Sequence, residues 1–349
     1  MEENKERQSN IELCRIISIL LVVLVHSNFS WTGTPGEGGN TTFARFLVQA
    51  FSIIGVNVFI LITGWFSTTI KLKSIVNLIY ICLFYSIVKI IWGAIAGTFV
   101  LKDVFFISNS NWFVVSYLGL VFLTPALNSL DSQQKLLKWL CIFLLVFEVY
   151  FSFFPALAAL EPGFNHGYSV LSFVVLYLIA RYMKLYGISD WIKRFGFVFY
   201  FILSILIGLM AYLVFIKGSS FNVNPNYFIR IYDYNNPMVI VSAICFFLGF
   251  ENLKINYSRF INHIAKSVLA VLLIHGSAAI NPFMKQWFTT ILDKYSDSWI
   301  VLSCLWLAGI LGIFILSVLI DQIRIISYKF VVSKLINKIE IKLYKETIE

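Results

Sequence analysis

Long apolar runs dominate the chain and are separated by short polar segments. Runs of about 18 or more apolar residues recur along the whole length, and this is the length that a helix needs to cross a bilayer. The segments between them are rich in Gly, Pro, Ser and Asn, as expected for loops. The pattern predicts an all-α polytopic membrane protein, a single integral-membrane domain over residues 1–349 with about ten transmembrane helices. The predicted spans are 11–30, 48–68, 74–99, 112–130, 138–156, 168–186, 195–216, 237–251, 262–282 and 298–320.

Composition and charge agree with this class. Of the 349 residues, 59% are hydrophobic and 13% are charged, which excludes a soluble domain of this length. The net charge of +9 is explained by the positive-inside rule, so nucleic acid is not expected as a partner. With a cytoplasmic N-terminus, 20 of the 27 Lys and Arg residues fall on the inner side, six fall outside, and Lys89 lies within the third span. Both termini are therefore predicted to be cytoplasmic.

The last segment, residues 321–349, is predicted to be an amphipathic tail. Ile and Phe side chains alternate with Lys at helical spacing there. Such a helix lies on a membrane surface with its lysines toward anionic head groups, so membrane lipid is a predicted partner.

The first predicted span contains two ionisable residues in an otherwise aliphatic stretch, Arg15 and His26. Eleven helical steps of about 100° amount to three turns plus roughly 20°, so both side chains are expected on one face, about 16 Å apart along the axis. Because an ionisable group inside a bilayer is costly, the pair is a candidate functional site. Two structural alternatives stay open: Arg15 could snorkel to the interface beside Glu12, and His26 could hydrogen-bond to a neighbouring helix.

His275 lies about 13 residues into the ninth span, at a depth similar to that of His26. Imidazole exchanges a proton near neutral pH, so two histidines at one level could share a site for general-base catalysis on a hydroxyl. A hydrogen bond between helices is the alternative explanation of His275. In the second span, Asn57 is a candidate polar anchor, and Gly64 would let helices approach closely.

Further candidates lie in the third to fifth spans. Trp112 opens the fourth span and is first expected in the interfacial aromatic belt, and Tyr117 follows it on the same helix. Glu148 and Lys89 both lie near mid-membrane, which predicts a buried ion pair, although Glu148 could instead carry protons in a transporter. The sequence has no metal-ligand or nucleotide-binding motif, so no metal is expected and a nucleotide-driven pump is not predicted.

Four stretches are similar to motifs of the membrane acyltransferase-3 family, ten-span bacterial enzymes that O-acylate cell-surface carbohydrates. In chain order they are ELCRIISILLVVLVHS (12–27), with the Arg-x10-His arrangement, GVNVFILITGWF (55–66), NWFVVSYLGLVFLTPALNSL (111–130) and SVLAVLLIHGS (267–277). The resemblance covers nearly the whole chain. Two features depart from it: Lys71 and Lys73 stand where many members have an Arg cluster, and no extracytoplasmic esterase-like domain is expected.

The resemblance implies an integral membrane O-acyltransferase of the bacterial inner membrane. Its donor would be a cytoplasmic acyl-CoA, most simply acetyl-CoA, and its acceptor a hydroxyl of a cell-surface or exopolysaccharide glycan. Arg15 would hold a CoA phosphate or orient the thioester arm, and His26 would act as general base or carry the acyl group, with His275 assisting. The candidate substrate-binding residues are His275, Asn57, Trp112, Tyr117 and Glu148.

The alternative is a transporter or flippase of a lipid-linked sugar or a small solute, with Lys89 and Glu148 as coupling groups. It predicts flux that is independent of acyl-CoA. It also predicts inverted repeats with Gly- or Pro-broken helices, which the sequence does not display. The acceptor glycan, the acyl group, covalent or direct transfer, and a homo-oligomeric state stay open.

Overall fold

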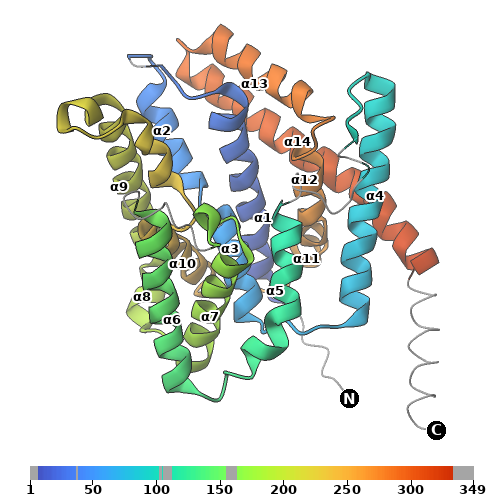
Figure 1. The fold of residues 1–349 in the computed structure, drawn as a ribbon. Coiled ribbons are helices and arrows are strands. Elements are labelled where there is room, and N and C mark those ends of the chain that lie inside the picture. The colour runs from blue at the N-terminus through green and yellow to red at the C-terminus, as the bar shows by residue number, and fades with distance from the viewer. Residues whose placement is uncertain (1–6, 37, 102–103, 105–111, 155–162, 333–349) are drawn as a thin grey trace.

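The computed structural model describes residues 7–36, 38–101, 104, 112–154 and 163–332. Over these residues the chain is all-helical and contains no strand (Figure 1), which confirms the predicted class. The α-helices are α1 (Ser9–Val25), α2 (Thr42–Ser52), α3 (Gly55–Trp65), α4 (Leu72–Ala96), α5 (Trp112–Asn128), α6 (Gln134–Glu148), α7 (Val170–Tyr186), α8 (Asp190–Arg194), α9 (Gly196–Lys217), α10 (Pro237–Glu251), α11 (Arg259–Ile264), α12 (Val268–His275), α13 (Asn281–Tyr295) and α14 (Trp299–Ser327). Short π-helical and 3-10 turns are His26–Ser30, Val149–Phe153, Asn165–Gly167, Gly218–Phe221, Pro225–Tyr232, Ala265–Ser267 and Tyr328–Val332.

Several of these helices have the length and composition of membrane spans. Within the described part of the chain, six helical segments are long and apolar enough to cross a bilayer. They are Ser9–Ser30, Thr42–Trp65, Leu72–Ala96, Gly196–Ser220, Pro225–Glu251 and Trp299–Phe330. The other predicted spans overlap shorter helices. The count of ten and the cytoplasmic placement of the termini stay predictions.

α3 is surrounded by other helices. Its sequence GVNVFILITGW is apolar on all sides, and every residue except Phe59 is buried. It packs against α1, α7 and α10. A Cβ atom at Gly64 would lie 2.5 Å from the Tyr177 carbonyl oxygen, and one at Gly55 would lie 2.7 Å from that of Ser18. Glycine is therefore required at both ends of α3, which confirms the close helix approach expected at Gly64.

The peripheral helices carry apolar side chains on their outer faces. α4 and α9 lie on opposite sides of the bundle (Figure 1). Large apolar residues such as Ile95, Leu213 and Leu316 are exposed on α4, α9 and α14. Exposed apolar side chains on these helices suit contact with lipid chains.

Several predicted boundaries differ from the structure. The span predicted at 48–68 is two helices, α2 and α3, and it begins at Thr42. The ninth span is likewise divided, and its last helix, α12, ends at His275 instead of residue 282. The amphipathic helix α13, which follows it, was not predicted.

The predicted start of the tail at residue 321 is wrong, because α14 continues to Ser327. Asp321 is completely buried and accepts hydrogen bonds from Arg324, at 2.9 Å, and from the hydroxyl of Tyr85, at 2.7 Å. This neutralised pair lets two charged residues stay inside the packed helix. Residues 333–349 of the predicted tail lie outside the described residues.

Candidate functional site

The first helix changes its winding at His26. α1 ends at Val25, and His26–Ser30 continue as a π-helical turn in which the Trp31 N–H donates to the His26 carbonyl. Single π-turns inserted into helices occur frequently at functional sites. Sequence analysis did not predict this turn, although its sequence, HSNFS, is mostly polar.

A buried arginine on α2 holds the π-turn. Arg45 donates from Nη2 to the carbonyl oxygens of Asn28, at 2.8 Å, and Gly33, at 2.5 Å, and from Nε to the Asn28 side-chain oxygen at 3.1 Å. These carbonyls lie at the C-terminal end of the helical segment, whose partial negative charge favours a cation. Sequence analysis counted Arg45 among the six Lys and Arg residues on the outer side and did not single it out. The signal that was available is its apolar context, FARFLVQAF, which is typical of a buried helix face.

His26 and His275 contact each other directly. Nδ1 of His26 lies 2.8 Å from Nε2 of His275, and the ring centroids are 4.9 Å apart. Nδ1 of His275 lies 2.6 Å from the carbonyl oxygen of Val271, one turn earlier on α12. His275 is completely buried, and the buried Trp31 ring lies 6.3 Å from each imidazole. The structure thus brings together the two histidines that were predicted to lie at one depth.

The hydrogen bonds fix which imidazole nitrogens carry protons. A carbonyl oxygen can only accept, so Nδ1 of His275 is protonated and, in the neutral ring, its Nε2 is an acceptor. The hydrogen between the two rings therefore belongs to Nδ1 of His26. This leaves Nε2 of His26 unprotonated, which is the form of imidazole that accepts a proton from a hydroxyl. The contact with His275 fixes the orientation of the His26 ring.

Two cavities share His26 as a wall residue. The larger cavity, about 600 Å³, is also lined by His275, Trp31, Trp112, Asn281 and Lys285. The smaller cavity, about 290 Å³, is also lined by Gln49, Trp112, Tyr168, Asp233 and Tyr234. Because both cavities include His26 and Trp112, two molecules could approach the same imidazole from different directions.

An aromatic cluster forms the wall of the smaller cavity. The Trp112 ring lies 4.6 Å from that of Tyr168 and 6.1 Å from that of Tyr234, between centroids. The buried Asn57 on α3 donates from Nδ2 to the Tyr234 carbonyl oxygen at 2.9 Å. Trp112 is thus a wall residue of both cavities, and Asn57 anchors the backbone behind this wall.

The other predicted site residues lie apart from the histidine pair. Arg15 is half-buried, its Nε is 3.9 Å from Oε2 of Glu12, and it lines neither of the two cavities. This is the geometry of the structural alternative considered for Arg15, and its role toward a donor stays a prediction. Tyr117 stacks on Phe113, with centroids 5.9 Å apart, and also lines neither cavity.

The predicted ion pair between Lys89 and Glu148 does not form. Both residues are described, and their helices, α4 and α6, lie on opposite sides of the bundle (Figure 1). Glu148 is buried and instead accepts a hydrogen bond from the Ser172 hydroxyl on α7. Matching depth was a correct criterion for burial, but it does not determine which helices are neighbours.

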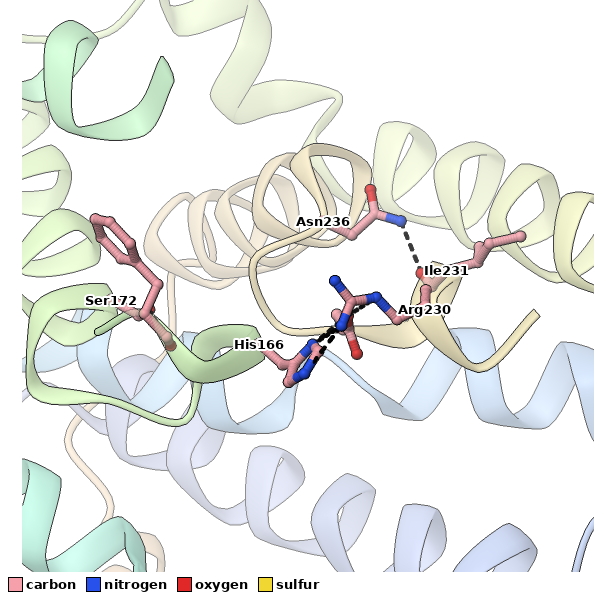
Figure 2. A network of polar contacts seen from close by, with 7 residues as sticks. His166, Ser172, Arg230, Ile231 and Asn236 are labelled. Atoms are coloured by element: carbon pink, nitrogen blue, oxygen red, sulfur yellow. Dashed lines mark hydrogen bonds and ion pairs between the residues drawn. The ribbon is translucent and has the colours of Figure 1, made fainter. Parts of the chain in front are cut away.

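Sequence analysis missed the polar group around Asp233, which precedes α10. Nε of Arg230 lies 3.2 Å from Oδ2 of Asp233, and Nδ1 of His166 lies 3.0 Å from the same oxygen. Figure 2 shows His166 and Arg230 directed toward one another. The signal in the sequence was the run of polar residues in YDYNNP next to an apolar helix. Within the described residues, no three His, Cys, Asp or Glu side chains form a group that could hold a metal ion.

The fold and the site together define a multi-pass membrane protein in which a hydrogen-bonded histidine pair lies beside two cavities, with His26 lining both. The family model of an acyltransferase domain matches residues 8–321 of the 349. The chain therefore belongs to the membrane acyltransferase-3 family, as its four motifs indicated, and the family suggests membrane acyltransferase activity. Comparison with curated proteins and with solved structures found no match.

Proposed function

We propose that the protein transfers an acyl group, most simply acetyl, from a cytoplasmic acyl-CoA to a hydroxyl of a cell-surface or exopolysaccharide glycan at the bacterial inner membrane. The observation that carries the proposal is the hydrogen-bonded series from Val271 through His275 to His26. It leaves Nε2 of His26 unprotonated, and His26 lines both cavities. Direct acyl transfer requires the acceptor hydroxyl beside the base and the donor thioester beside that hydroxyl, which two cavities lined by the same imidazole allow.

In the proposed reaction His26 is the general base. Nε2 of His26 takes the proton of the acceptor hydroxyl while the hydroxyl oxygen bonds to the carbonyl carbon of the thioester. The C–S bond then breaks, and the CoA thiolate leaves and receives the proton from His26. The positive charge on His26 is stabilised during this step, because its Nδ1–H still donates to His275. A covalent route, in which His26 carries the acyl group, would use the same nitrogen.

Arg15 is proposed to act at the donor end. The Arg15 side chain is 35% exposed, and it lies about 16 Å from His26 along the helix axis. The contact with Glu12, at 3.9 Å, is too long for a hydrogen bond and leaves the guanidinium donors available. A guanidinium binds phosphate in a bidentate manner, and an extended pantetheine arm is of comparable length to the separation from His26.

The proposal is tested by mass spectrometry of surface glycans from cells with and without the gene, and from cells carrying His26→Ala. We expect an ester-linked mass increment, removed by mild alkali, that requires the gene and is lost in His26→Ala. His263→Ala is the matched control, because His263 is an exposed histidine bonded to Gln322 on α14, away from both cavities. An unchanged ester content with loss of polymer export would overturn the proposal in favour of a transporter.

A further inference from the structure

The smaller cavity differs from the larger one in the chemistry of its lining. Among its described lining residues, Asp233 is the only Asp, Glu, Lys or Arg, and Gln49 adds an amide. The larger cavity has the opposite character, since the described part of its lining includes Lys285 and no carboxylate. The two cavities at His26 are therefore suited to different ligands.

Size limits what the smaller cavity can hold. Its volume of about 290 Å³ equals the liquid volume of roughly ten water molecules. That is comparable with one hexose ring, which has about twelve non-hydrogen atoms, and is too small for the whole of a CoA molecule. The aromatic rings of Trp112, Tyr168 and Tyr234 provide apolar surfaces for the C–H faces of such a ring. Gln49 and Asp233 provide acceptors for its hydroxyls.

The carboxylate of Asp233 is held in place by two side chains that lie outside the cavity lining. Asp233 is 9% exposed, and the side chains of Arg230 and His166 both contact its Oδ2. Neither Arg230 nor His166 lines the cavity, whereas Asp233 does. A carboxylate that is fixed by a guanidinium and an imidazole keeps one orientation, and this is required for a directional contact with a ligand.

The turn that carries His166 is conformationally strained. Asn165 and His166 have φ values of 44° and 55°, in the left-handed region that non-glycine residues rarely adopt. The next residue, Gly167, has φ 93°, and a Cβ atom there would lie 2.5 Å from the Tyr234 Cβ. The backbone of this turn therefore packs closely against Tyr234, a wall residue of the smaller cavity. Such strain persists only where the surrounding structure enforces it, and it concentrates at ligand sites.

We propose that the smaller cavity is the acceptor subsite, that it takes one neutral sugar ring of the acceptor, and that Asp233 determines its specificity. This inference rests on the proposed acyl transfer. The ring stacks on Trp112 and Tyr168, one hydroxyl is directed to Nε2 of His26, and another donates to Asp233. A ring with its own carboxylate is disfavoured, because two like charges would be desolvated side by side.

The test uses the full-length protein in lipid nanodiscs and follows release of the CoA thiol. The donor is acetyl-CoA, and the acceptor probes are a methyl hexopyranoside and the corresponding methyl hexopyranosiduronate. We expect the neutral probe to be the better acceptor. In Asp233→Asn and in Tyr168→Leu, the KM for the neutral probe should rise about tenfold or more, while the KM for acetyl-CoA stays constant. In Asp233→Asn the preference for the neutral probe over the uronate should also become smaller, because the carboxylate that disfavours a second carboxylate is removed.

Tyr227→Leu is the matched control, since this exposed tyrosine lines neither cavity, and its acceptor KM should stay at the wild-type value. If Asp233→Asn does not fold, as judged by size-exclusion chromatography, Tyr168→Leu decides alone. A wild-type protein that releases no CoA thiol with either probe, and that leaves the glycans of intact cells without esters, overturns the acyltransferase proposal and this inference with it. A wild-type protein that transfers the acyl group, with variants whose acceptor KM is unchanged, overturns the assignment of the smaller cavity only.

Discussion

Replacement of His275 tests whether this residue sets the tautomer of His26. In His275→Leu the acceptor that lies 2.8 Å from Nδ1 of His26 is removed, so this N–H has no partner in a buried position. An unsatisfied buried donor costs about 1–3 kcal/mol. The tautomer protonated at Nε2 avoids this cost, but Nε2 is the nitrogen that should act as base. A free-energy difference of this size corresponds to a fall in kcat of about 5- to 150-fold.

His275→Gln separates the loss of the hydrogen bond from the loss of packing. The side-chain carbonyl of Gln can reach the position of the His275 Nε2 and accept from Nδ1 of His26, so the tautomer is retained. We expect kcat within about tenfold of the wild-type value for Gln, and the larger fall for Leu. Both variants are measured in nanodiscs by acceptor-dependent release of CoA thiol, after size-exclusion chromatography has established that they are folded. Equal kcat values for the folded Leu and Gln variants would show that His275 does not set the tautomer of His26.

Three further predictions concern stability, each measured by thermal unfolding in detergent. Gly64→Ala should destabilise the protein by about 1–3 kcal/mol, because the added Cβ would overlap α7. Gly312→Ala on α14 is the control and should be neutral or slightly stabilising, because no atom lies within 4 Å of the added Cβ. Equal melting temperatures for the two variants would contradict the close packing of α3 on α7. Arg45→Gln should lower stability by about 1–3 kcal/mol and reduce activity, because the carbonyl oxygens of Asn28 and Gly33 lose their donor. Full activity would show that the π-turn keeps its conformation without Arg45. Asp321→Asn should lower the free energy of unfolding by about 3–5 kcal/mol, because it leaves the charge of Arg324 buried and unpaired. An unchanged melting temperature would show that water reaches this pair.

Hydropathy predicted the helical class because a bilayer-length apolar run can satisfy its backbone hydrogen bonds only as a helix in lipid. It also placed His26 and His275 at one depth, since depth follows from the position of a residue within its span. It did not place the break at Ile53–Ile54, where apolar residues continue on both sides. Nor did it indicate that α14 continues past Asp321, because the charge there is compensated by its own helix and by α4.

Lateral arrangement was the part of the site that the sequence could not provide. The pairing of Glu148 was wrong because depth does not determine which helices are adjacent, and its partner is Ser172 on the next helix. The contact of His166 with Asp233 joins two loops that are far apart in the chain, and no local pattern encodes it. Tertiary packing, which single-sequence periodicity does not contain, decides such contacts.

The proposed reaction depends on His26 acting as the base that activates the acceptor hydroxyl. The most direct measurement compares acyl transfer from radiolabelled acetyl-CoA to acceptor glycan by wild-type and His26→Ala proteins reconstituted in nanodiscs, with equilibrium binding of acetyl-CoA measured on the same samples. We expect a loss of transfer of about 10²- to 10⁴-fold in His26→Ala, with unchanged binding of acetyl-CoA. A folded His26→Ala protein that transfers the label at the wild-type rate would contradict the assignment of His26 as the base.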